Sequence, residues 1–126
     1  MYIILGVLLC VLAGIAKGVQ DTLAHYFDIS VFNDPNKFNP AFWNPKKSSI
    51  NKWDYTTGVK KEKFFGSSTF LVSFTDGWHL AQLAHLNPLI LGVFIIGYNE
   101  SFYGLVIGVL LYRVVFEICH RWIFKT

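Results

Sequence analysis

The stretch YIILGVLLCVLAGIA, residues 2–16, decides the fold class because it contains no charged side chain. A second apolar stretch, SFYGLVIGVLLYRVVF at residues 101–116, contains a single charge, at Arg113. Each stretch is close to the roughly 20 residues that an α-helix needs to cross the hydrocarbon core of a bilayer. A soluble domain would instead scatter its apolar residues periodically along the chain. Both stretches are therefore predicted to span a membrane.

A third apolar run extends from Gly66 to Gly97, and it is interrupted by polar residues. Its second half is long enough to span a bilayer if the helix begins to cross near His79. The composition agrees with this interpretation, since 53% of the residues are hydrophobic and only 15% are charged. We therefore predict an all-α integral membrane protein with three transmembrane helices and a long cytoplasmic loop rich in aromatic residues and lysine.

The positions of the basic residues predict the orientation in the membrane. Seven lysines lie between the first and second spans, whereas the connection at residues 98–101 contains none. Arg121 and Lys125 follow the third span. The positive-inside rule then places the long loop and the C-terminus in the cytoplasm, and the N-terminus outside. The seven lysines are Lys37, Lys46, Lys47, Lys52, Lys60, Lys61 and Lys63.

The sequence disfavours a cleaved signal peptide, a site built from paired cysteines, and nucleic-acid binding. The first helix is expected to be retained and not cleaved as a signal peptide, because no basic region precedes it and the first lysine is Lys17. Cys10 and Cys119 belong to different spans at different expected depths, which favours neither a disulfide nor a paired-cysteine metal site. A net charge of +3 with dispersed basic residues does not favour nucleic-acid binding.

Three segments are expected along the chain. Residues 1–29 are predicted to form the first transmembrane helix with a cytoplasmic extension, ending around Ser30. Residues 30–65 are predicted to be an irregular loop, because Asn-Pro and Asp-Pro dipeptides recur in them. Residues 66–126 are predicted to form a hairpin of two transmembrane helices. The sequence Gly-Ser-Ser-Thr at 66–69 offers hydroxyl groups as N-caps for the first of these helices.

The loop at 30–65 is open to two interpretations. Its lysines alternate with aromatic residues, a mixture that suits a segment at the level of the lipid headgroups. The same residues also suit a small cytoplasmic cap folded over the helix ends. The aromatic residues concerned are Phe38, Phe42, Trp43, Trp53 and Tyr55.

Two glycine motifs predict close packing between the helices. The first span contains Gly14-x-x-x-Gly18, and the third contains Gly104-x-x-x-Gly108. Small residues at this spacing let two helices approach closely in lipid.

Each predicted span carries one acid and one histidine near its cytoplasmic end. Asp76 and His79 are three residues apart and share one face of a helix, which His85 does not join. Carboxylate and histidine side chains from several helices are how bundle proteins hold iron, manganese or zinc. The candidate ligands for such a divalent metal are Asp21, His25, Asp76, His79, Glu117 and His120.

The chain resembles a family of small integral membrane proteins of Bacteroidetes-type bacteria and their phages. The resemblance is carried by DTLAHYFDISVF (21–32), FWNPKKSSINKW (42–53) and KFFGSSTFLVSFTDGWHLAQ (63–82) and covers about residues 17–85. It implies a location in the bacterial inner membrane, and it implies no particular activity.

Three functions therefore stay open at the level of the sequence. In the first, a zinc, manganese or iron ion serves hydrolysis at the membrane surface or the oxidation of a lipid or quinol. In the second, the polar residues hold the bundle together in a non-catalytic accessory subunit or phage-type membrane factor, whose aromatic loop docks a protein partner. In the third, the chain forms a small channel or holin-like homo-oligomer. In each case the lipid bilayer is the first partner.

Overall fold

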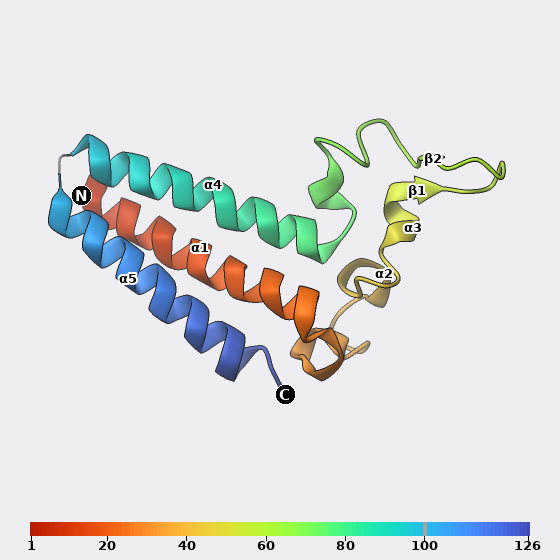
Figure 1. Ribbon diagram of the computed structural model, residues 1–126, viewed down its shortest axis with the longest axis horizontal. Coiled ribbons are helices and arrows are strands. Elements are labelled where there is room, and N and C mark those ends of the chain that lie inside the picture. Colours follow the sequence, from red (N-terminus) through yellow and green to blue (C-terminus); the bar gives the residue numbers. More distant parts are fainter. Residues whose placement is uncertain (100) are drawn as a thin grey trace.

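Three long helices dominate the computed structural model, which describes residues 1–99 and 101–126 (Figure 1). They are α1 (Tyr2–His25), α4 (Gly77–Tyr98) and α5 (Phe102–Ile118), and the last continues through one π-helical turn, η4 (Cys119–Ile123). All three are long and apolar enough to cross a membrane. The prediction of a mainly helical protein with three candidate spans is confirmed.

Helix α1 is the central element of the bundle. It lies between α4 and α5 and packs against both along its length, whereas α4 and α5 contact each other less (Figure 1). The faces that α4 and α5 turn away from α1 are covered with exposed aliphatic and aromatic side chains. Examples are Ile90, Phe94, Val109 and Leu110.

Glycines line the contacts that α1 makes with its two neighbours. A Cβ atom built on Gly14 would lie 2.6 Å from the carbonyl oxygen of Tyr112 in α5. A Cβ built on Gly92 of α4 would lie 2.7 Å from the carbonyl oxygen of Gly6. A Cβ built on Gly108 of α5 would lie 3.3 Å from Cys10 Sγ of α1, a looser contact with a side chain. The close approach predicted from the glycine spacing is confirmed, and Gly6 and Gly92 add a second contact of this kind.

Residues 27–76 form a folded unit at one end of the bundle, which we call the cap. The elements of the cap are η1 (Phe27–Ile29), η2 (Val31–Asn33), α2 (Pro40–Trp43), α3 (Ser49–Lys52), β1 (Trp53–Asp54), β2 (Lys61–Glu62) and η3 (Val72–Phe74). Strands β1 and β2 pair antiparallel, with Trp53 opposite Glu62. Residues 30–65, predicted to be an irregular loop, thus consist of short helical turns and a hairpin with two-residue strands, joined by turns.

The first half of the cap has an aromatic core. Phe27 and Phe32 are buried with Leu23 of α1, and the ring of Phe32 stacks on Trp43 at 5.2 Å between centroids and 12° between planes. Phe38 also packs against this core. Phe38 and Trp43 therefore hold the cap on the helix ends, as the cap interpretation requires.

The first helix ends earlier than predicted, at His25 and not around Ser30. Beyond it the backbone pairs with the C-terminal residues: the Val31 N–H donates to the Phe124 carbonyl at 2.9 Å. The Thr126 N–H donates to the Ile29 carbonyl at 2.8 Å. These long-range bonds replace the i to i−4 bonds that a longer helix would make.

The second long helix begins at Gly77, so the prediction that it starts near Gly66 was wrong. The Ser67 and Ser68 hydroxyl groups, expected to act as N-caps of this helix, instead form hydrogen bonds within residues 27–76. Ser67 Oγ donates to the Lys52 carbonyl at 2.8 Å, and Ser68 Oγ donates to the Glu62 carboxylate. Gly66 itself has a φ of +80°, which suits a turn and not a helix.

Candidate functional site at the junction of cap and bundle

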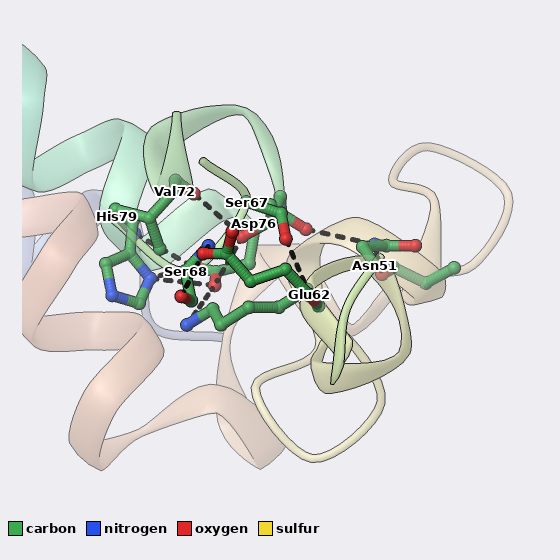
Figure 2. Close-up of polar contacts among 10 residues, drawn as sticks. Asn51, Glu62, Ser67, Ser68, Val72, Asp76 and His79 are labelled. Atoms are coloured by element: carbon green, nitrogen blue, oxygen red, sulfur yellow. Dashed lines mark hydrogen bonds and ion pairs between the residues drawn. The ribbon is translucent and has the colours of Figure 1, made fainter. Parts of the chain in front are cut away.

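Asp76 is the residue at which the cap becomes α4. Asp76 is only 6% exposed, and its Oδ1 accepts the backbone N–H of His79 at 2.8 Å, which makes Asp76 the N-cap of the helix. The ring Nδ1–H of His79 donates to Oδ2 of the same carboxylate at 2.7 Å (Figure 2). Asp76 and His79 are thus in direct contact, as their spacing predicted, through a helix cap.

A lysine from the cap completes this site. Lys52 Nζ lies 3.7 Å from Asp76 Oδ2, and both side chains are largely buried. Next to it, Asn51 Nδ2 donates to the carbonyl of Ala41 and, at 3.0 Å, to the carbonyl of Thr75. Together Lys52 and Asn51 connect α2 and α3 to the first turn of α4.

Glu62 organises the chain that leads into this junction. Its carboxylate accepts the hydroxyl of Ser68, the backbone N–H of Ser68 at 3.0 Å and the backbone N–H of Gly66 at 3.1 Å (Figure 2). The hydrogen bonds from Ser68 and then Gly66 hold the pKa of Glu62 below its usual range. Glu62 therefore fixes the turn at residues 66–68 as an anion.

Asp21 and His25, the predicted pair of the first helix, do not contact each other in any hydrogen bond or ion pair of the described residues. Asp21 instead binds Lys17, one turn earlier, at 2.6 Å. His25 is exposed and lies edge-on to the ring of Tyr26. The carboxylate of Asp21 is therefore neutralised within its own helix.

Glu117 and His120, the predicted pair of the third helix, also have separate partners. Glu117 Oε2 lies 2.6 Å from Arg121 Nε, and its Oε1 lies 3.7 Å from Arg113. His120 Nδ1 lies 3.3 Å from Thr22 Oγ1 of α1, and the His120 ring stacks on Phe116. Glu117 thus holds arginines, while His120 joins two helices.

A cavity of about 520 Å³ lies at this end of α5, where the chain leaves the bundle. Its lining contains two cations and one carboxylate beside aromatic rings. The lining residues are Tyr26, Phe116, Glu117, His120, Arg121 and Lys125.

The six predicted ligands lie at one end of the bundle, where α1 and α5 end and α4 begins (Figure 1). They do not converge on one point: among the described residues, no three His, Cys, Asp or Glu side chains are grouped so that they could hold a metal ion. The structure does not bring the six together: Asp21 and Glu117 are bound by Lys17 and Arg121, and Asp76 is in contact with His79 and Lys52.

Three polar contacts in this region could not be predicted from the sequence. Lys52 reaches Asp76 across a sequence separation that contains a hairpin and several turns. Tyr112 of α5 is joined to His85 of α4 by a hydrogen bond of 3.0 Å. Thr22 is fully buried beside His120. Nothing in the local sequence marks these pairs, since each partner lies on a different element.

Comparisons of the chain with protein-family models, with curated proteins and with solved structures returned no match.

Proposed function

We propose that the protein is a non-catalytic integral membrane protein, an accessory component whose three-helix bundle carries a folded cytoplasmic cap. The observation that carries this proposal is that each candidate carboxylate is bound by groups of the protein itself. Asp21 and Glu117 are bound by Lys17 and Arg121 at 2.6 Å, and Asp76 caps a helix while binding Lys52 and His79. Their oxygens are turned toward protein donors, which supports a structural role for these carboxylates.

Membrane insertion is supported by the outward faces of the bundle. A soluble protein rarely exposes apolar patches that run along three helices, because such patches drive association in water. Within the described chain, Arg113 is a charged residue inside a candidate span, and it points along α5 to Glu117. Long basic side chains near a helix end reach the interface in this way.

The proposed location is the bacterial inner membrane, with the cap and the C-terminus in the cytoplasm. The support is the placement of the lysines: seven belong to the cap, and none belongs to the connection between α4 and α5. Because the cap and the chain's C-terminal residues are hydrogen-bonded to each other, they must lie on the same side.

Cysteine labelling tests this orientation. In a variant with Cys10 and Cys119 replaced by alanine, Asn99→Cys in the α4–α5 connection is expected to react with a membrane-impermeant maleimide in intact spheroplasts. Thr57→Cys, in the turn of the β-hairpin, is expected to react only after the membrane is permeabilised. Labelling of Thr57→Cys in intact spheroplasts would reverse the proposed orientation.

Metal analysis tests the structural role of the candidate residues against a divalent-metal site. The protein purified in mild detergent without a histidine tag is expected to contain no stoichiometric zinc, manganese or iron. The double variant His79→Ala/His120→Ala is expected to match it in metal content. It is also expected to unfold at a lower temperature, because the substitutions remove the hydrogen bonds of both rings. Stoichiometric metal in the wild type that is lost in the variant would overturn the proposal in favour of a divalent-metal site.

A further inference from the structure

The second half of the cap exposes a group of phenylalanine rings. Within residues 64–74, Phe65 is 84% exposed, Phe70 is 66% exposed and Phe74 is 65% exposed, and Phe64 is also exposed. The phenylalanine side chain cannot hydrogen-bond to water. A group of exposed phenylalanine rings therefore marks a surface that contacts an apolar partner or a membrane. We call residues 64–74 the phenylalanine segment.

The phenylalanine segment is held in place by hydrogen bonds. Its entry is fixed by Glu62, and Ser67 Oγ donates to the Lys52 carbonyl. Inside it, the Leu71 N–H donates to the Gly66 carbonyl at 2.9 Å. Phe65 and Phe70 contact each other edge to face, with centroids 5.6 Å apart. The exposure of these rings is therefore a property of an ordered turn.

The position of this segment brings it to the membrane surface. It ends at Phe74, and α4 begins at Gly77. Figure 1 shows it beyond the first turn of α4, on the side of that helix that faces away from α1, and η3 packs against α4. If α4 spans the bilayer, the segment overhangs the lipids that surround the start of this helix.

A cavity with a mixed polar and apolar lining lies beside two of these rings, Phe64 and Phe74. It has a volume of about 390 Å³ and is walled by Phe42, Phe64 and Phe74. Its polar lining groups are already bonded within the cap: Asn51 Nδ2 to two carbonyls and Lys63 Nζ to the Ile50 carbonyl at 2.8 Å.

The charge beside the segment complements the same surface. Lys61, in the strand that leads into the segment, is exposed and takes part in none of the ion pairs of the described residues. Lys60 lies over the ring of Trp53, with Nζ 4.0 Å from its centroid. Basic residues next to inserted aromatic rings are typical of a protein surface that contacts anionic headgroups.

We propose that the phenylalanine segment is an interfacial membrane anchor, an inference that rests on the insertion of the three helices proposed above. Phe65, Phe70 and Phe74 insert into the cytoplasmic leaflet beside α4, and the neighbouring lysines contact the phosphate groups of anionic lipids. The cap is then attached to the membrane on two sides: by its aromatic core to the helix ends, and by the phenylalanine segment to the lipid.

Spin labels at matched positions test this proposal. In the variant without Cys10 and Cys119, labels are placed at Phe65→Cys, Phe70→Cys, Thr57→Cys and Leu110→Cys, one at a time. The full chain is reconstituted in vesicles of phosphatidylcholine and phosphatidylglycerol. Accessibility to oxygen, which concentrates in lipid, is compared with accessibility to a water-soluble nickel chelate.

The labels at positions 65 and 70 are expected to favour oxygen over the chelate, as Leu110 on the outer face of α5 does. Thr57, in the hairpin turn, is expected to favour the chelate. Chelate access at 65 and 70 equal to that at 57 would overturn the anchor, and so would protection from both reagents, which would indicate a protein partner or a second copy. Chelate access at Leu110 would instead show that the bundle is not inserted, and the proposed function would fail first.

Discussion

Gly92→Ala is expected to destabilise the bundle by about 1–3 kcal/mol, the usual cost of adding a methyl group to a packed interface. The added Cβ would lie 2.7 Å from the carbonyl oxygen of Gly6 and 3.1 Å from Cys10 Sγ. A backbone oxygen cannot turn aside as a side chain can, so α1 and α4 would have to separate. The loss is measured as a lower midpoint of thermal unfolding in detergent, followed by circular dichroism.

Gly97→Ala is the matched control, since Gly97 is in the same helix and no heavy atom of the described residues would lie within 4 Å of its added Cβ. It is expected to leave the midpoint unchanged or to raise it, because alanine favours a helix over glycine by up to about 1 kcal/mol. Equal midpoints for the two variants would contradict the contact between Gly6 and Gly92.

The three spans could be predicted from the sequence because hydropathy is a local property. A run such as residues 2–16 needs no partner to be recognised, and its length is close to the roughly 20 residues that cross a bilayer. The glycine contacts were partly predictable for the same reason. The spacing of Gly14 and Gly18 marks a surface that can pack closely, although it does not say which helix packs there.

The boundary of the second helix could not be predicted from local signals. Residues 66–69 have the composition of a helix N-terminus, and Asp76 has it equally well. The choice depends on Glu62 and Lys52, which bind the hydroxyls of Ser68 and Ser67 and so hold this stretch in a turn. Those partners come from the end of α3 and from strand β2, and the sequence around residue 66 does not indicate that they approach it.

The sequence indicated which acids and histidines lie near one end of the bundle, but it did not indicate which of them are in contact. Asp76 and His79 do share a face, as their spacing requires. Helical spacing also places Arg121 one turn from Glu117, and Lys17 one turn from Asp21. An ion pair within one helix needs no contact with another helix. A cluster would bring three carboxylates together, which repel one another, so the ion pairs within each helix are favoured.

Asp76→Ala is expected to cost about 2 kcal/mol or more in the free energy of unfolding. The substitution removes an N-cap, which is worth roughly 0.5–2 kcal/mol. It also leaves Lys52, whose side chain is 17% exposed, without its carboxylate. Both losses act at the point where the cap joins α4, so the cap is expected to become more susceptible to proteolysis than the bundle. Thermal unfolding and limited proteolysis of the detergent-purified protein measure the two effects.

Two controls separate the contributions of Asp76. Asp76→Asn keeps an oxygen that can cap the helix and removes the charge, so it is expected to fall between the wild type and Asp76→Ala. Asp28→Ala breaks an exposed pair with Lys46 and is expected to change stability by less than about 1 kcal/mol. If Asp76→Ala were no more harmful than Asp28→Ala, the buried contacts of Asp76 would not hold the cap. Its carboxylate and His79 would then be free for a chemical role, and the non-catalytic proposal would lose its principal support.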